Sequence, residues 1–213
     1  MAQPPLNWRA PDGRAEALAA LNAAGAEKGP HWAASTRAVF GEGPLDAPLA
    51  LIGEQPGDKE DEEGRPFVGP AGRLLDRALE EAGIARRDCY LTNAVKHFKF
   101  VQRGKRRIHQ KPGAGDVAYY RWWLEAELDL VAPRRVVTLG ATALLALSGK
   151  PLAISRLRGP ARLQGREAFV TVHPSSILRA PDADRAGAYA GFLADLRAAR
   201  DLSVADLPPA GAH

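Results

Sequence analysis

Four short runs of apolar and β-branched residues along the chain predict buried strands. These runs are Pro48–Gly53, Cys89–Ala94, Arg135–Gly140 and Ala168–His173. Helical periodicity covers Arg14–Ala24, Pro70–Ala82, Gly115–Val131, Ala141–Leu147 and Ala183–Arg200. Strands that alternate with helices predict an α/β fold whose parallel sheet is covered on both faces. Such sheets bind ligands at the carboxyl ends of their strands, so candidate site residues are sought just after each run.

Composition narrows the class of protein. The 213 residues are 46% hydrophobic and 25% charged, with a net charge of +4, which suits one folded domain rather than a disordered chain. We expect that domain over residues 12–202, a flexible N-terminus over 1–11 and a flexible tail over 203–213, because both ends are rich in Pro and Ala. The single cysteine, Cys89, excludes an internal disulfide and a metal site built from cysteines alone.

Neither a membrane span nor a signal peptide is expected from the sequence. No apolar run approaches the roughly 20 residues of a membrane helix, and the first residues lack a charged start followed by an apolar stretch. We therefore expect a soluble cytoplasmic protein that binds no membrane.

The segment after the first strand is long and rich in glycine and proline. Glu54 stands at the strand end, with Gln55 and Asp58 close behind, and Phe67 lies further along, where a flat ring can stack on a planar ligand. The acidic stretch 58–63 is alternatively a solvated turn. Phe67 is alternatively a plug beneath its own loop.

The segment after the second strand is polar and then strongly basic. Asn93 offers the donor and acceptor needed to read a base edge, or it closes the strand with a turn. From Lys96 to Lys111 there are seven Lys and Arg residues and no acid, with Phe98 and Phe100 among them. Such a stripe is typical of a phosphate-binding loop, and it ends at His109. A solvated charged face and an inert histidine are the alternatives.

The last predicted strand ends at His173, followed by Pro174, Ser175 and, a few residues on, Arg179. His173 is placed to face the same edge as Glu54 and Asn93, although a histidine that caps the sheet is the simpler alternative. A serine nucleophile is not expected, because the chain has no Gly-x-Ser-x-Gly turn.

Four motifs together resemble the uracil-DNA glycosylase superfamily, nearest to its family 4. They are Gly53–Gly57 (GEQPG), Pro66–Asp76 (PFVGPAGRLLD), Thr92–Phe98 (TNAVKHF) and His173–Ser176 (HPSS). The segment Lys105–His109 (KRRIH) is similar to the UdgX branch of that superfamily. The resemblance covers about residues 35–197 and implies a three-layer α/β/α sandwich around a four-stranded parallel sheet.

The resemblance also implies roles for individual residues. Phe67 would stack on an extruded uracil, Asn93 would bind its edge, His173 would stabilise the leaving uracil anion and Glu54 would lie beneath C1′. In proteins of the UdgX type His109 would attack C1′ and remain bonded to the DNA. The backbone around Gln55 and the loop Gly64–Gly69 would complete the pocket, and Asp58 is a further candidate for binding the substrate. Residues expected to contact DNA are Lys96, Lys105, Arg106, Arg107, Ser175 and Arg179.

The resemblance implies a [4Fe-4S] cluster that this sequence does not favour. Aligned by eye, three of the four ligand positions fall near Ala26, Gly29 and Tyr120, and only His97 could ligate. We therefore predict no cluster and no metal, with the space filled by packed aromatic rings. The candidates are Trp32, Tyr119, Tyr120, Trp122 and Trp123.

The leading hypothesis is a single-turnover uracil-DNA glycosylase that becomes covalently attached to DNA through His109. The alternatives are a glycosylase that turns over and releases abasic DNA, and a non-catalytic protein that binds uracil or single-stranded DNA. The expected partner is uracil-containing DNA, preferably single-stranded. We expect a monomer in a bacterial cytoplasm, associated with the nucleoid.

Overall fold

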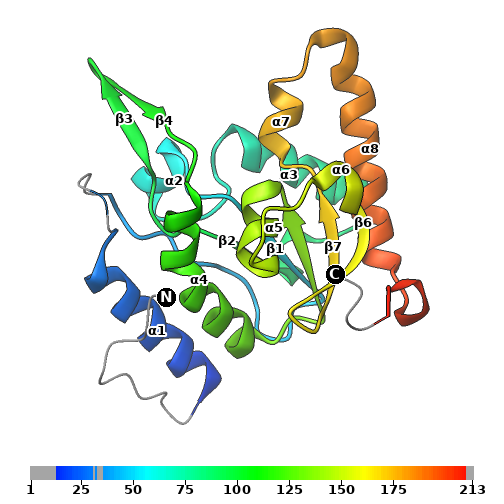
Figure 1. The fold of residues 1–213 in the computed structure, drawn as a ribbon, viewed down its shortest axis with the longest axis horizontal. Coiled ribbons are helices and arrows are strands. Elements are labelled where there is room, and N and C mark those ends of the chain that lie inside the picture. Colours follow the sequence, from blue (N-terminus) through cyan, green and yellow to red (C-terminus); the bar gives the residue numbers. More distant parts are fainter. Residues whose placement is uncertain (1–12, 31, 33–35, 210–213) are drawn as a thin grey trace.

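The computed structural model describes residues 13–30, 32 and 36–209, and a single mixed sheet organises this part of the chain (Figure 1). The sheet has five strands in the order β2-β1-β5-β7-β6. The strands are β1 (Leu49–Gly53), β2 (Cys89–Asn93), β5 (Arg135–Leu139), β6 (Gly159–Leu163) and β7 (Arg166–Thr171). The first three and β7 are parallel, as predicted from their apolar runs.

The fifth strand corrects the predicted count of four. β6 pairs antiparallel with β7 at the edge of the sheet. It begins at Gly159-Pro160, and only Ala161 and Leu163 are buried, so it carries no continuous apolar run. An edge strand with one solvent-exposed face has too few apolar residues to be recognised from the sequence.

The helices form two layers on the two faces of the sheet. The five predicted helices are confirmed as α1 (Arg14–Lys28), α3 (Pro70–Glu81), α4 (Ala114–Val131), α5 (Ala141–Ser148) and α8 (Asp182–Asp201). Along β1, Ala50 and Ile52 pack with α4 and α5, whereas Leu49 and Leu51 pack with α3 and α8. This alternation is the period of a strand buried on both faces. It gives the predicted three-layer α/β/α sandwich.

Short helices occupy segments for which no helix was predicted. They are α2 (Asp58–Glu63), α6 (Ile154–Leu157), α7 (Pro174–Leu178) and the 3₁₀ turns η1 (Arg86–Asp88) and η2 (Val204–Asp206). The acidic stretch 58–63 is therefore helical. Glu60 and Asp61 in it are buried rather than solvated.

The basic segment is an antiparallel hairpin that stands out from the body of the protein (Figure 1). Its strands are β3 (Phe100–Arg103) and β4 (Arg106–His109), joined by Gly104 and Lys105. Gly104 has φ 57°, and Lys105 is not among the residues with positive φ. That combination is the two-residue II′ turn, which matches the twist of paired strands and needs glycine first. The predicted basic loop is thus a regular hairpin.

The two ends of the chain differ in what the structure describes. The N-terminal segment 1–11, predicted to be flexible, lies outside the described residues. In the predicted tail, Leu207 packs against the apolar cluster beneath α8, and Arg162 Nε donates to the carbonyl of Pro208. Residues 210–213 are not described. Within the described ranges, no helix combines the length and the hydropathy needed to cross a membrane.

Candidate active site

The carboxyl ends of β1 and β2 bring Glu54 and Asn93 together at one edge of the sheet. Gly53 and Asn93 are register partners in the parallel pair. A Cβ on Gly53 would lie 2.4 Å from Asn93 Oδ1 and 2.6 Å from Phe67 Cζ. Only glycine therefore lets the Asn93 amide and the Phe67 ring approach the strand end so closely.

Phe67 and His173 form one wall of this site. Their rings are 6.4 Å apart between centroids, with an angle of 27° between planes. Phe67 is 5% exposed and has φ 56°, a left-handed conformation that a bulky residue adopts only when its surroundings hold it there. Contacts from other parts of the chain therefore hold the Phe67 turn in this conformation.

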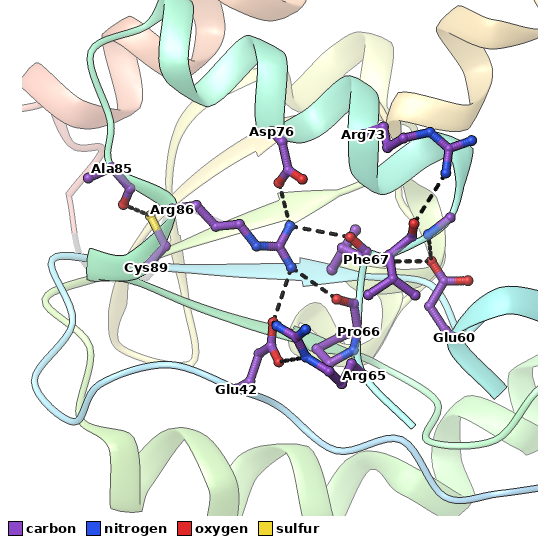
Figure 2. Close-up of polar contacts among 12 residues, drawn as sticks. Glu42, Glu60, Arg65, Pro66, Phe67, Arg73, Asp76, Ala85, Arg86 and Cys89 are labelled. Atoms are coloured by element: carbon purple, nitrogen blue, oxygen red, sulfur yellow. Dashed lines mark hydrogen bonds and ion pairs between the residues drawn. The ribbon is translucent and has the colours of Figure 1, made fainter. Parts of the chain in front are cut away.

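Arg86 supplies those contacts from the far side of the turn (Figure 2). Its guanidinium donates to the carbonyl oxygens of Phe67 at 3.2 Å and Pro66 at 3.1 Å. It also pairs with Glu42 and with Asp76 of α3. Two acidic partners and two carbonyls leave this guanidinium well satisfied, so it fixes the turn that carries Phe67.

Glu60 holds the same loop from its other end. One carboxylate oxygen accepts from the N–H groups of Val68 at 3.1 Å and Gly69 at 2.8 Å, and the other accepts from Gly57 at 3.1 Å. The carboxylate therefore joins the start of α2 to the start of α3. Sequence reasoning missed Glu60 and Arg86, because neither lies at a strand end.

Asn93 is fixed by a buried ion pair. Lys96 Nζ donates to the backbone carbonyl of Asn93 at 2.8 Å and pairs with Glu127 Oε2 at 2.6 Å. Both charged side chains are 1% exposed. Glu127 also accepts from Tyr90 and Thr92, so its lone pairs are used. Burial lowers the pKa of Lys96, and the Glu127 carboxylate opposes that change.

Lys96 is therefore a correction to the predicted DNA contacts. Its ammonium lies beneath the site and cannot reach a phosphate at the surface. The sequence shows Lys96 only as one member of a basic run. Its partner on α4, Glu127, lies 31 residues further along the chain, so the local pattern does not reveal the pairing.

Glu54 and His109 meet at the mouth of the site. His109 Nε2 lies 3.2 Å from Glu54 Oε1, and Thr142 Oγ1 donates to Glu54 Oε2 at 2.5 Å. Burial raises the pKa of Glu54, but hydrogen bonds with His109 and Thr142 and the charge interactions with His109 and His173 together leave the net pKa below its usual value. Glu54 is thus a carboxylate at neutral pH, and its side chain is 22% exposed. Thr142, at the start of α5, was missed, although it follows the strand end at Gly140.

His173 is held as a neutral donor. Burial lowers its pKa to about 4. Its Nδ1 accepts from the backbone N–H of Ser175 at 3.1 Å, so the neutral ring carries its proton on Nε2. The Ser175 hydroxyl lies 2.8 Å from the same Nδ1. Ser175, predicted to contact DNA, therefore orients His173, while Arg179 remains exposed at the end of α7.

Arg107 joins the hairpin to α2. Its guanidinium pairs with Asp58 at 2.5 Å and also with Asp61. It lies 5.4 Å from the ring centroids of both Phe98 and Phe100. Arg107 was predicted to bind DNA and Asp58 to bind substrate. The structure pairs these two side chains with each other, and both assignments stay predictions.

Gln55 ties down the base of the hairpin. Its amide nitrogen donates to the carbonyls of Lys99 and Gln110, both at 3.2 Å, and its oxygen accepts from Lys99 N–H at 3.1 Å. The Gln55 side chain is therefore engaged within the protein, whereas the predicted contact of Gln55 with substrate is through its backbone. Gln55 and Arg107 together fix the strand that ends at His109.

The donor set around His97 does not fit an iron–sulfur cluster, which requires several cysteine thiolates. His97 Nδ1 is 2.7 Å from the Tyr120 hydroxyl, and burial lowers the His97 pKa to about 4. Cys89 packs on the opposite face of the sheet from Tyr120. Across the described part of the chain no group of three or more His, Cys, Asp or Glu residues could hold a metal.

Aromatic rings surround His97. Trp32 packs edge-on against both His97 and Tyr120, and Tyr120 contacts Tyr119 and Trp123. The absence of a cluster remains a prediction. It is tested by iron analysis of the purified protein, which should be colourless.

Comparison with known proteins gives the class to which this fold and site belong. Residues 40–197 match the uracil DNA glycosylase superfamily. The chain belongs to that superfamily.

Its relatives include type-4 uracil-DNA glycosylases. The protein of that name from Thermotoga maritima is 40% identical over 147 residues, which cover 68% of this chain and 73% of the relative. That of Pyrobaculum aerophilum is 36% identical over 154 residues, covering 68% and 74%. That of Sulfurisphaera tokodaii is 32% identical over 161 residues, covering 71% and 70%.

Proposed function

We propose that this protein excises uracil from DNA and becomes covalently attached to the resulting sugar through His109. The observation that carries the proposal is the 3.2 Å contact between His109 Nε2 and Glu54 Oε1 at the carboxyl edge of the sheet. Membership of the superfamily and the names of the relatives support the excision. The contact supports the attachment, because it places an imidazole beside the carboxylate expected to lie beneath C1′.

Uracil recognition is assigned to Asn93, Phe67 and His173. The Asn93 amide carries a donor and an acceptor, which suit the edge of uracil. The Phe67 ring offers a flat apolar face for the base. His173 donates from Nε2, the nitrogen left free by the bond from Ser175, to a uracil oxygen.

Bond cleavage creates opposite charges that the site is built to stabilise. The C1′–N1 bond breaks with its electron pair remaining on uracil, so the sugar becomes cationic and the base anionic. A fixed carboxylate near C1′ and a fixed N–H donor near the uracil oxygen stabilise both charges without reorganising. Glu54 and His173 occupy these two positions. Glu54 is ionised and His173 neutral at pH 7, as both roles require.

Capture of the sugar is assigned to His109. An imidazole nitrogen of His109 forms the new bond to C1′. The ring then loses its N–H proton, which Glu54 accepts. Proximity allows this imidazole to react before water, provided that it is held in place. Gln55 and Arg107 hold the hairpin strand that ends at His109. The product has no route to release, so each protein molecule would act once.

DNA binding is assigned to exposed cations around the mouth, namely Lys105, Arg106 and Arg179. We propose single-stranded DNA as the favoured form, because a base that is already unpaired costs less to extrude. We also propose that the protein acts as a monomer and is associated with the nucleoid of a bacterial cytoplasm.

The stoichiometry of uracil release tests the proposed function. Excess uracil-containing single-stranded DNA is mixed with the protein, and free uracil is quantified over time. The wild type should release one uracil per protein molecule and then stop. The His109→Ala variant should continue beyond one equivalent, because water can then reach C1′. Continued release by the wild type would identify an ordinary turnover glycosylase. No release would identify a non-catalytic binding protein.

A further inference from the structure

The β3–β4 hairpin has two faces with different surroundings. Register pairs Phe100 with His109 and Gln102 with Arg107, so these four residues share the inner face. On that face Arg107 binds α2 and His109 contacts Glu54. The other face carries two pairs, Val101 with Ile108 and Arg103 with Arg106. These four residues are called the outer face below.

The outer face exposes an apolar pair. Val101 is 44% exposed and Ile108 is 42% exposed. β-Branched residues opposite each other on an antiparallel pair lie in contact, so they form one apolar spot rather than two scattered residues. Ile108 directly precedes His109. The apolar spot therefore lies on the reverse side of the strand that delivers the proposed nucleophile.

Three cations lie next to this spot, on the side of the hairpin turn. Arg103 and Arg106 share the outer face, and Lys105 lies in the turn beside them. In the part of the chain that the structure describes, none of the three forms an ion pair with an acidic side chain, whereas Arg107 on the inner face forms three. No Asp or Glu occurs between Cys89 and Gly115. A surface of this kind is complementary to a polyanion that also presents apolar rings.

We propose that the outer face binds the DNA strand beside the extruded nucleotide. Val101 and Ile108 pack against an adjacent unstacked base, and Arg103, Lys105 and Arg106 bind the phosphates on either side. Aliphatic side chains are used in this way to fill or wedge open base steps, while cations release counterions from phosphates. The proposal rests on the proposed function only in taking DNA as the ligand. The hairpin would then carry the nucleophile on one side and a strand-binding surface on the other.

In Figure 1 the hairpin projects at the upper left of the molecule, and α7 lies to its right, also near the top. α7 carries Ser175 and begins directly after His173. In the proposal the DNA strand runs from the site across the hairpin.

Salt-dependent binding to uracil-free single-stranded DNA tests the proposal separately from catalysis. Fluorescence anisotropy is measured with a labelled oligonucleotide at several salt concentrations. The Val101→Ser/Ile108→Ser variant should bind about 10-fold more weakly at every salt concentration, with an unchanged slope, because it loses apolar contacts only. Each phosphate contact with a single strand contributes roughly 0.7 to the slope of log affinity against log salt. The Arg103→Gln/Lys105→Gln/Arg106→Gln variant loses three such contacts, so the steepness of that slope should fall by about 2.

Two further measurements make the outcome decisive. The control Val204→Ser removes an exposed valine from η2, 61% exposed and outside the hairpin, and should leave binding unchanged. Circular dichroism and thermal unfolding should show both hairpin variants folded as the wild type, since only exposed side chains change.

Unchanged affinity in the Val101/Ile108 variant would overturn the apolar contact, and an unchanged salt slope in the Arg103/Lys105/Arg106 variant would overturn the phosphate contacts. If the two hairpin variants lost affinity for duplex DNA only, the assignment to single-stranded DNA would be overturned. A protein that passes these tests but releases no uracil would refute the proposed function alone.

Discussion

His109 Nε2 lies 3.2 Å from Glu54 Oε1, although one residue ends a strand of the hairpin and the other follows a strand of the main sheet. Glu54 follows a central strand of the main sheet, and His109 ends a strand of the two-stranded hairpin. Their contact depends on how the hairpin docks on α2. The geometry of the proposed reaction is thus set by contacts distant from the reacting atoms.

Replacing Glu54 with Gln should nearly abolish excision. The variant keeps the size and the hydrogen bond from Thr142 but lacks the charge that stabilises a cationic sugar. Losses on the order of 100-fold or more are typical when a preorganised electrostatic group is removed. Single-turnover assays with excess protein measure this rate. Glu63→Gln, at the exposed end of α2, is the matched control, and equal rates for the two variants would remove Glu54 from the chemistry.

Replacing Arg107 with Ala should slow attachment to DNA without changing the salt dependence of binding. Arg107 already pairs with Asp58 and Asp61, so it does not neutralise phosphate. Losing it frees the hairpin, and His109 then spends less time at Glu54. We expect about 10-fold slower attachment, from the sensitivity of such reactions to small misplacements. Asp61→Asn, which weakens the same latch from α2, should give the same phenotype.

The variant Arg106→Gln is the control for Arg107→Ala, because Arg106 is the adjacent arginine and its side chain is exposed. It should reduce the salt slope by about 0.7 while leaving the rate of attachment at saturating DNA unchanged. If Arg107→Ala reduced the slope instead, Arg107 would be a phosphate contact and not a latch.

Replacing Arg86 with Ala should weaken uracil binding through Phe67. The change leaves the Pro66 and Phe67 carbonyls and two carboxylates without their donor, which costs about 1–3 kcal/mol in the free energy of unfolding. It also releases the strained turn. Inhibition of excision by free uracil measures the effect on the base site, and we expect about 10-fold weaker inhibition. Arg87→Ala is the control, because its side chain is 87% exposed and lies one residue away. A stability loss with normal inhibition by uracil would confine Arg86 to a structural role.

Acid should destabilise the protein through its buried histidines. Burial lowers the pKa of His97 and of His173 to about 4 from the usual 6.5. The unfolded chain therefore binds protons first as the pH falls. The stability from each group is complete above about pH 6.5 and is lost progressively as the pH falls through 4. Denaturant unfolding at several pH values measures this loss.

His97→Phe should flatten that dependence, by up to about 1.4 kcal/mol for each pH unit between 6.5 and 4. The variant leaves the Tyr120 hydroxyl without its partner, which lowers stability equally at every pH. The slope rather than the absolute value is therefore the test. An unchanged slope would mean that His97 titrates normally in the folded protein.

The sequence predicted most of what depends on local pattern. The parallel strands and long helices followed from apolar runs and helical periodicity, and Glu54, Asn93 and His173 followed from the rule that strand ends meet at one edge. The edge strand β6 was missed because it buries only two side chains. The resemblance implied a role for His109 with Glu54 as its partner, and the structure adds the 3.2 Å contact between the two side chains.

Ion pairing separates three basic residues that the sequence could not tell apart. Lys96, Arg106 and Arg107 look alike in the sequence. One is buried on Glu127, one is exposed, and one is latched to Asp58 and Asp61. These acids lie 31 to 49 residues from their partners, so a local pattern carries no information on them. Arg86 and Glu60, whose contacts shape the Phe67 turn, were missed for a different reason, because neither lies at a strand end.

The central claim is that His109 forms a covalent bond to DNA, and denaturing electrophoresis followed by intact mass analysis tests it most directly. The wild type incubated with uracil-containing single-stranded DNA should give a band that resists denaturation. Its mass should equal protein plus DNA minus uracil. His109→Ala should give no such band while still releasing uracil. A wild type that releases uracil and leaves no band, or a band that persists in His109→Ala, would contradict the account.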